Sequence, residues 1–322
     1  MPVRDELPVT SVWLTCQRPA REQRRGRYVA QTSRHPAKML PDAAAHAIAS
    51  YTAPGELVGD PMSGSGTTLV EAVRSGRDAI GVDIEPTFTD IAEANLRLAA
   101  AHGATAWSRV VTGDATGLVP LLPASVHGRV SLVLTSPPYG RRTHGLVRTA
   151  PGAGVHKRDH LYGERGAGNL AYVGWDRLLG GWEQIVAGCY QMLRPGGTFV
   201  FACRPVRIAP DNLIDLPGEL FSAAVSVGLR PVERCIAMLA AVRDGTIIHR
   251  ASMFGLMGVR RARAAGIPAA LVAHEDVYVL RRPFSAASSA EPECSQRQPK
   301  RSRRSLSHVD ASVHVESGGS VA

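Results

Sequence analysis

The stretch "ELVGDPMSGSGTTLVEAVRSGRDAIGVDIEP", residues 56–86, decides the fold class. It predicts a strand ending at Asp60, a turn rich in glycine and serine, a helix, and a second strand that ends at Asp83. The glycines of such a turn let a ligand approach the backbone, and the helix directs its N-terminal amide groups at that ligand. Asp83 can accept hydrogen bonds from ribose hydroxyls. This order is typical of the nucleotide-binding half of a doubly wound α/β fold.

The spacing of this turn narrows the class of ligand. It does not match the dinucleotide spacing G-x-G-x-x-G, and no lysine follows Gly66 as a phosphate-binding P-loop requires. A tight strand-to-helix connection without a ligand is the alternative for the turn taken alone. With Asp83 at the end of the second strand, the pattern favours a nucleoside without a polyphosphate, and S-adenosyl-L-methionine is such a molecule.

Around this stretch, short β-branched runs alternate with longer amphipathic runs between residues 35 and 283. That alternation predicts one α/β domain with a mostly parallel sheet and helices on both faces. The seven predicted strands cover residues 56–59, 79–82, 109–112, 130–134, 198–202, 232–239 and 276–280. The predicted helices cover residues 67–75, 86–101, 175–193 and 217–227.

Four segments depart from this rhythm. Residues 1–34 form a predicted basic N-terminal arm, whose arginines gather at Arg18, Arg21, Arg24, Arg25 and Arg27. Two insertions, at about residues 140–172 and 241–273, have the length of functional or disordered loops, and "FGLMGVRRARAAG" in the second predicts a basic helix. Residues 284–322 carry few large apolar side chains, which predicts a disordered tail.

The net charge of +9 and the sequence pI near 9.7 favour an acidic partner such as nucleic acid, because counterion release supplies the sequence-independent part of that binding. An arginine-rich proteome is the alternative explanation of the charge. The five cysteines are scattered and odd in number, so we expect reduced thiols and no metal site. No stretch approaches the roughly 18 apolar residues of a membrane span and no signal peptide is evident, so we expect a cytoplasmic protein.

A second motif, "TSPPY" at residues 135–139, follows an apolar strand whose carboxyl end is where ligands of open α/β sheets bind. The exocyclic amine of a nucleobase is a poor nucleophile, because its lone pair is delocalised into the ring. The Ser136 hydroxyl and the Pro137 carbonyl can accept both amine hydrogens, which positions the nitrogen for methyl transfer. Pro137 and Pro138 make the turn rigid, and Tyr139 offers a face on which a flipped base stacks. The alternative is a proline-rich turn with a core tyrosine.

Both motifs resemble those of one family. "DPMSGSGTT" resembles D-P-F-x-G-S-G-T-T of the amino-directed DNA methyltransferases, which modify cytosine N4 or adenine N6, with Met62 in place of the usual Phe. "HPAKMLP" is similar to the family's H-P-x-x-K-P element, and "TGDAT" supplies Asp114 beside the cofactor adenine. The implied catalytic residues are Ser136, Pro137, Pro138 and Tyr139. The implied cofactor-binding residues are His35, Pro36, Lys38, Asp60, Pro61, Met62, Ser63, Gly64, Ser65, Gly66, Thr67, Thr68, Asp83, Asp114 and Thr135.

The resemblance spans residues 35–283 and implies a class I S-adenosylmethionine methyltransferase fold, which is Rossmann-like with a seven-stranded sheet. It also implies S-adenosyl-L-methionine as the cofactor. The Ser-Pro-Pro-Tyr form favours cytosine N4 over adenine N6, and the absence of a Pro-Cys pair argues against carbon-5 methylation. DNA contacts are expected in the two insertions and the basic arm.

Two alternatives to DNA methylation stay open. "PPYG" followed by arginines is also similar to tRNA guanine-N2 methyltransferases, which act on structured RNA. Those enzymes usually carry a separate N-terminal RNA-binding domain, for which the 34 residues before His35 are too few. An inactive methyltransferase fold that only binds nucleic acid is less favoured, because the Ser-Pro-Pro-Tyr tetrad is intact.

Overall fold

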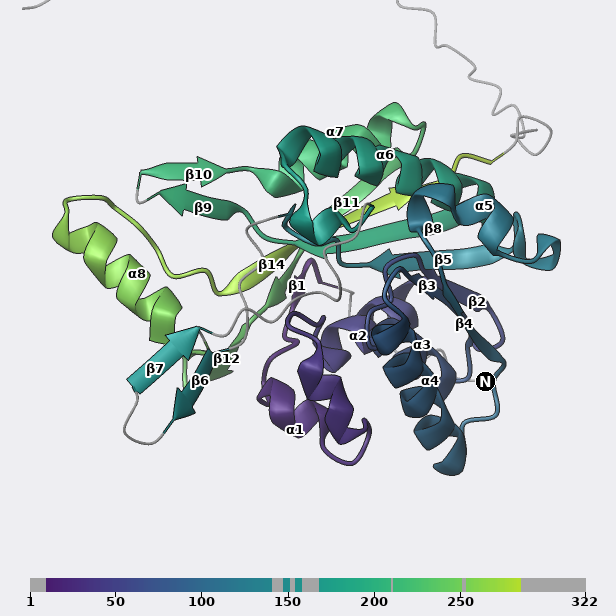
Figure 1. Ribbon diagram of the computed structural model, residues 1–322, viewed down its shortest axis with the longest axis horizontal. Coiled ribbons are helices and arrows are strands. Elements are labelled where there is room, and N and C mark those ends of the chain that lie inside the picture. The colour runs from purple at the N-terminus through teal and green to yellow at the C-terminus, as the bar shows by residue number, and fades with distance from the viewer. Residues whose placement is uncertain are drawn as a thin grey trace, which may run out of the picture. The chain divides into compact units, whose positions relative to one another are not determined.

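A central sheet of eight strands, in the order β1-β11-β14-β8-β5-β2-β3-β4, runs through the computed structural model (Figure 1). The structure describes residues 10–140, 147–150, 154–157, 168–209, 211–250 and 253–284. The strands of the sheet are β1 (Val12–Trp13), β2 (Leu57–Asp60), β3 (Asp78–Asp83), β4 (Ser108–Thr112), β5 (Val130–Thr135), β8 (Leu193–Cys203), β11 (Arg230–Met238) and β14 (His274–Arg281). All seven strands predicted from the sequence are present. β1 is an eighth strand, and its two residues are too few to show a period.

The strand order places a ligand site beside β2 and β5. From β2 the chain moves outward to β3 and β4, whereas β5 begins the other half of the sheet and is followed there by β8. These neighbours pair in parallel, and only β14 runs antiparallel to its neighbours β8 and β11 within this sheet. Ligands of open parallel sheets bind at the carboxyl ends of strands, where the order reverses. The chain therefore has the class I methyltransferase fold that its sequence predicts.

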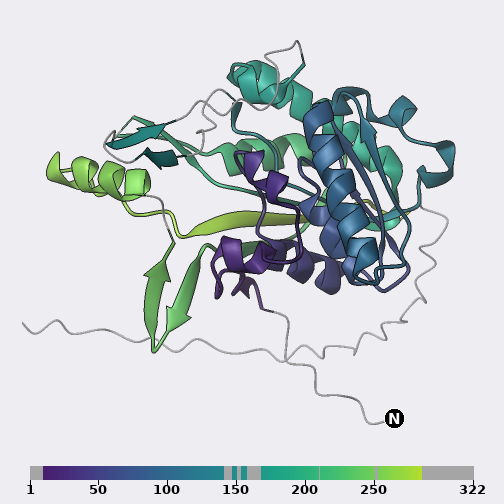
Figure 2. The same ribbon diagram turned by 60° about the horizontal axis from the view of Figure 1, so that its bottom comes forward.

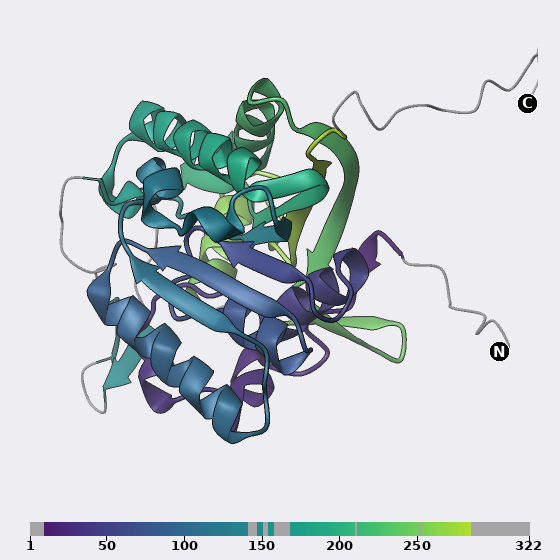
Figure 3. The same ribbon diagram turned by 90° about the vertical axis from the view of Figure 1, so that its right-hand side faces the viewer.

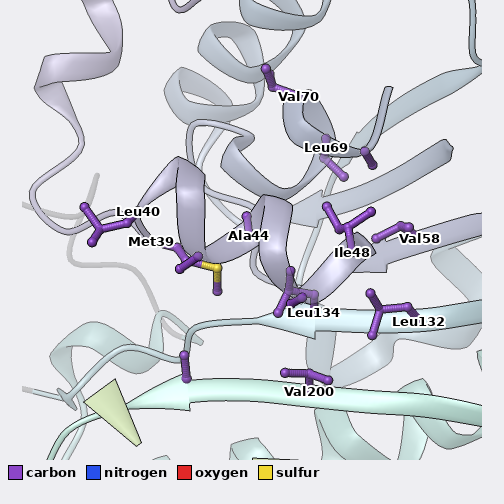
Figure 4. Close-up of a cluster of buried hydrophobic side chains, with 14 of the residues drawn as sticks. Met39, Leu40, Ala44, Ile48, Val58, Leu69, Val70, Leu132, Leu134 and Val200 are labelled. Carbon is purple, nitrogen blue, oxygen red and sulfur yellow. The ribbon is translucent and has the colours of Figure 1, made fainter. Parts of the chain in front are cut away.

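Helices cover both faces of the sheet (Figure 3). On one face lie α2 (Pro41–Tyr51), α3 (Thr67–Arg74) and α4 (Pro86–Ala101), and on the other lie α5 (Leu118–Leu121), α6 (Trp175–Met192) and α7 (Leu216–Ser226). Ile48 of α2 belongs to the same buried cluster as Leu132 and Leu134 of β5 (Figure 4). Val133, between those two leucines, belongs to the opposite cluster with Trp182 of α6. The alternation of side chains along β5 thus gives the sheet two cores.

The described part of the predicted basic arm, residues 10–34, is folded into the domain rather than extended from it. It contains β1, the helix α1 (Ala20–Arg24) and the 3-10 turn η1 (Ala30–Arg34). Gln23 is fully buried and donates to two backbone carbonyls. Arg27 and Tyr28 both donate to the carboxylate of Glu71 in α3. These contacts correct the boundary expected at residue 34, because the preceding segment is part of the same packed body.

Both predicted insertions hold additional elements. The described part of the first contains the hairpin of β6 (Val147–Ala150) and β7 (Gly154–Lys157). The second contains the hairpin of β12 (Ala240–Arg243) and β13 (Thr246–His249), then α8 (Met253–Ala264), which confirms the basic helix predicted there. In two views, these elements project beyond the end of the sheet at which β14 begins (Figures 1 and 2).

The remaining segments are short or fall outside the description. β9 (Val206–Ala209) and β10 (Asn212–Ile214) form a further hairpin. Residues 285–322, which the sequence predicts as a disordered tail, lie outside the described residues. None of the helices in the described ranges has the length and apolar character needed to cross a bilayer.

Candidate functional site

A cavity of about 500 Å³ lies where β2, β3 and β5 end. All the predicted catalytic residues line it, and so do all the predicted cofactor-binding residues except Gly66 and Thr135. Thr135 is fully buried as the last residue of β5. Gly66 is the N-cap of α3 with a φ of +81°, and a Cβ there would lie 2.9 Å from Cβ of Ala92 in α4. Gly66 therefore allows α3 and α4 to approach, rather than contributing to the wall of the cavity.

Two carboxylates hold the turn between β2 and α3. Asp83 Oδ2 accepts a hydrogen bond from Gly64 N–H at 2.7 Å, and its Oδ1 accepts one from Glu85 N–H at 3.0 Å. Asp60 Oδ1 accepts one from Met62 N–H at 3.1 Å. Burial raises the pKa of Asp60 and of Asp83 to about 6. Each Asp83 oxygen keeps a further lone pair, so this carboxylate can also accept hydrogen bonds from a ligand.

Two serine hydroxyls in the turn indicate that the cavity takes a polar ligand. Ser63 and Ser65 are buried and line the cavity, and within the described part of the chain neither hydroxyl has a hydrogen-bond partner. Buried hydroxyls in folded proteins nearly always have such a partner. The turn is therefore built around groups that a bound molecule supplies, as the nucleoside and amino-acid parts of S-adenosyl-L-methionine would.

The "HPAK" element shapes the same turn from the other side. His35 is buried, its ring lies 4.4 Å from that of Phe88, and a Cβ at Gly64 would meet His35 Nε2 at 2.6 Å. Glycine is thus the residue that fits between His35 and Asp83, with a φ of +51° that glycine adopts without strain. Burial lowers the pKa of His35 to about 3, so the imidazole is neutral at physiological pH. The imidazole packs against the turn and also lines the cavity.

Two positive charges face the cavity near the start of α3. Arg24 donates to Thr67 Oγ1 at 3.2 Å and to the Met39 carbonyl at 2.5 Å, and Lys38 donates to the His35 carbonyl. Burial and the charge of Arg24 lower the pKa of Lys38 to about 8. Among the described residues neither cation forms a salt bridge. Two neighbouring cations at a helix N-terminus favour an anionic ligand group such as a carboxylate.

The Ser-Pro-Pro-Tyr tetrad follows β5 directly and enters the same cavity. Pro137 is buried, whereas Ser136, Pro138 and Tyr139 are partly exposed. Gly140 ends the tetrad with a φ of +57°, and a Cβ there would lie 3.1 Å from the Val173 carbonyl. Burial raises the pKa of Tyr139, so its hydroxyl stays protonated.

Several residues that sequence reasoning missed also line the cavity. They include Arg24, Glu85, Asn169, Arg204 and Glu275. Asn169 donates to Glu85 Oε1 at 2.7 Å, which joins the end of the first insertion to the turn after β3. The sequence contains no pattern that assigns these residues to the cavity. Glu85 follows Asp83 by two residues, whereas the other four come to the cavity from distant parts of the chain. Asp114, which was predicted, caps η2 (Ala115–Gly117) by accepting from Thr116 N–H at 2.9 Å.

Comparison with known proteins identifies the N-terminal part of the chain. Residues 3–94 match a family model described as DNA methylase, of the N6 and N4 type. This segment is similar to the DNA methylase family, in agreement with the motifs that the sequence contains. The similarity supports S-adenosyl-L-methionine, which the sequence predicts as the cofactor. The DNA methylase segment contains the "HPAK" element, the turn at 60–68 and Asp83, whereas Asp114 and the tetrad lie beyond it.

One curated relative is the Type II methyltransferase M.MjaII from Methanocaldococcus jannaschii, which is 33% identical over 76 residues. The match covers 24% of this chain and 14% of that protein, so the two share only part of their lengths. Similar solved structures include TrmN from Thermus thermophilus, with 17% identity, a TM-score of 0.47, and coverage of 81% of this chain and 53% of that one. A methyltransferase from Methanosarcina mazei has 12% identity, a TM-score of 0.42, and coverage of 74% and 98%.

Proposed function

We propose that this protein transfers a methyl group from S-adenosyl-L-methionine to an exocyclic amino nitrogen of a DNA base, with cytosine N4 favoured over adenine N6. The observation that carries the proposal is the shared cavity. The DNA methylase turn after β2 and the Ser-Pro-Pro-Tyr tetrad after β5 line it together, although they are about 70 residues apart in the chain. The bound cofactor supplies an electrophilic methyl group, and the tetrad supplies groups that orient an amine.

Residues from several separate segments would hold the cofactor. Asp83 would accept hydrogen bonds from the ribose hydroxyls, and the hydroxyls of Ser63 and Ser65 would bond to polar groups of the ligand. Arg24 and Lys38 bind the carboxylate of the methionine part, which neutralises charge that the described residues leave unbalanced. Asp114 lines the cavity, and the family resemblance implies that it would lie beside the cofactor adenine.

At the tetrad, the protein acts by holding the amine. Ser136 Oγ and the Pro137 carbonyl accept its two hydrogens, which turns the lone pair away from the ring and toward the methyl group. Pro137 and Pro138 have no N–H, so the backbone at these two positions presents carbonyl acceptors only. The Tyr139 ring stacks on a base that has left the duplex. The methylated nitrogen would be cationic, and it would return to neutrality by losing one of these two hydrogens as a proton to water.

We expect the affinity for S-adenosylhomocysteine, the cofactor product, to fall below about pH 6. Ribose hydroxyls donate to the ionised form of Asp83, whose pKa burial raises to about 6. A ligand that binds the ionised form loses up to about tenfold in affinity for each pH unit below that pKa, whereas Asp83 adds no pH dependence above it. Calorimetric titrations between pH 5 and pH 8 measure this.

Asp83→Asn is the control for this prediction, because its side chain does not titrate. The variant should bind more weakly at pH 8 and lose most of the slope below pH 6. A wild-type affinity that is constant from pH 5 to pH 8 would contradict the role of Asp83.

The nucleic acid meets the protein at the rim of this cavity. The second insertion leaves the sheet where β11 ends at Met238 and returns to it where β14 begins at His274. The adjoining residues Leu239 and Glu275 line the cavity. The backbone hydrogen bond from Leu239 N–H to the Ala273 carbonyl, at 2.7 Å, closes the base of that insertion. Residues 240–266 contain five arginines and one acidic residue. The insertion therefore presents positive charge where a flipped base enters.

Replacing Arg260 and Arg261 of α8 together with alanine should weaken DNA binding and flatten its salt dependence. Both side chains are exposed. Two lost phosphate contacts reduce the slope of log K against log salt by about 1.8. Fluorescence anisotropy on duplex DNA at several salt concentrations measures the slope. Arg129 is an exposed arginine that precedes β5, at the end of the strand opposite the cavity. Arg129→Ala should leave the slope unchanged. Equal slopes for wild type and the α8 variant would show that α8 does not contact phosphates.

Methyl transfer to two substrate pools tests the proposed function. The purified chain is incubated with methyl-labelled cofactor and either unmethylated genomic DNA or total RNA. We expect label in DNA and none above background in RNA. Label confined to RNA would support the guanine-N2 alternative, and label in neither pool would support an inactive fold.

A further inference from the structure

A second polar group lies beside the tetrad, on the side away from the cofactor turn. Arg204 follows the last residue of β8, and Glu275 is the second residue of β14. These strands pair with Cys203 opposite Asp276, so Arg204 and Glu275 meet across the pair. Both side chains line the cavity. In the order β14-β8-β5-β2-β3 the tetrad after β5 stands between them and the cofactor turn after β2.

Contacts hold Arg204 next to the base-stacking residue. Arg204 Nε lies 3.9 Å from Glu275 Oε1, and Arg204 Cζ lies 5.9 Å from the ring centre of Tyr139. The second distance is near the outer limit of a cation–π contact, so the guanidinium stands beside the ring rather than close against it. Pro205 follows Arg204 and restricts its backbone to extended conformations, which fixes where the side chain starts.

The edges of the nucleobases differ in what they offer beside the reactive amine. Next to N4, cytosine presents two adjacent acceptors, N3 and O2. Next to N6, adenine presents one acceptor, N1, followed by a C–H group. Next to N2, guanine presents a donor, N1–H. A guanidinium has only donors, held in a planar fork that fits two adjacent acceptors.

We propose that Arg204 determines the choice of base by donating to N3 and O2 of a flipped cytosine whose amine lies on Ser136. Glu275 is a positioning residue, because its carboxylate pairs with the guanidinium on the Nε side. With adenine, one N–H of the fork would face the C–H group of the base and have no acceptor. With guanine, an N–H of the fork would face the N1–H of the base, so that two donors would meet. This inference rests on the proposed function and adds to it the residue that selects cytosine.

The test compares the full-length wild type with Arg204→Lys and Glu275→Gln on genomic DNA from a host without amino methylation. Nucleoside mass analysis gives the rates of N4-methylcytosine and N6-methyladenine formation. We expect wild type to form N4-methylcytosine, and Arg204→Lys, which keeps the charge but not the fork, to form it about 5- to 150-fold more slowly. The ratio of methylcytosine to methyladenine should fall in both variants. Affinity for S-adenosylhomocysteine should not change in either.

Matched controls separate base selection from folding. Arg207→Lys changes an exposed arginine of β9 and should leave the rate and the ratio unchanged. Loss of S-adenosylhomocysteine binding in Arg204→Lys would mean that its fold is damaged. The isosteric Glu275→Gln then tests the inference, because a residue with a merely structural role would not alter the ratio of the two methylated bases.

Three outcomes would overturn the inference, and they differ in whether the proposed function also fails. Unchanged cytosine rate and base ratio in both variants would remove the role of Arg204 and leave DNA methylation standing. N6-methyladenine as the wild-type product would remove the choice of cytosine. N2-methylguanosine in RNA, with unmodified DNA, would remove the proposed function together with the inference.

Discussion

Ser136→Ala should lower the turnover of methyl transfer by about 100- to 1,000-fold, the loss expected when one acceptor aimed at the reacting group is removed. Ser136 lines the cavity and forms no hydrogen bond within the described part of the chain, so its removal breaks no contact of the fold. The effect should therefore fall on turnover and not on stability. Initial rates with saturating DNA and cofactor measure it.

Ser125→Ala is the matched control for that prediction. Ser125 is an exposed serine before β5, outside the cavity, and its hydroxyl is absent from the proposed chemistry. This variant should keep wild-type turnover. Both variants should keep the melting temperature and the S-adenosylhomocysteine affinity of wild type. Equal turnover in Ser136→Ala and wild type would rule out Ser136 as the residue that orients the amine.

Arg24→Met should weaken S-adenosylhomocysteine binding by about 10- to 100-fold, the usual effect of removing a hydrogen bond to a charged group. Its guanidinium lies at the start of α3 beside Lys38, and the two cations together suit one carboxylate. Binding of 5′-methylthioadenosine, which has the nucleoside but no carboxylate, should not change. Calorimetric titration with the two ligands measures the difference.

The neighbouring Arg25 provides the control, because it is exposed whereas Arg24 lies in the cavity wall. Arg25→Met should bind both ligands as wild type does. Equal losses for both ligands in Arg24→Met would mean that the substitution damages the fold. Equal affinities of Arg24→Met and wild type for S-adenosylhomocysteine would show that Arg24 does not bind the carboxylate.

The elements of the fold follow from local patterns, and for this reason the sequence predicts most of them. α4 begins at Pro86 and ends at Ala101, as expected, because a proline in the first turn and a long amphipathic run define it. β5 is mostly apolar, and all six of its residues are buried, as a central parallel strand requires. The two-residue β1 gives no such signal.

The folded state of residues 10–34 could not be predicted in the same way. Five arginines within ten residues indicate a solvated, basic segment. Two of these arginines instead lie within the domain. Arg27 forms an ion pair with Glu71 of α3, and Arg24 lines the cavity. Both contacts depend on the packing of α3, which no periodicity within the segment reveals. Arg24 is therefore less available for DNA contacts than the predicted basic arm implies.

Some residues of the candidate site follow from sequence motifs, whereas others depend on the pairing of distant strands. Asp60, Asp83 and Ser136 end or follow strands within recognisable motifs, so the sequence places them together. Arg204 and Glu275 come together because β14 inserts antiparallel between β8 and β11. That order is a property of the whole sheet and not of either segment. Long-range strand pairing of this kind leaves no local pattern.

The central claim, that this chain methylates an amino nitrogen of a DNA base, is tested most directly by the nucleosides of DNA from a host without amino methylation. The host expresses either wild type or Ser136→Ala at matched levels, and its DNA is digested and analysed by mass. We expect N4-methylcytosine in DNA from cells that express wild type, and none in DNA from cells that express Ser136→Ala. DNA without any amino-methylated nucleoside in cells that contain folded, cofactor-binding wild type would contradict it.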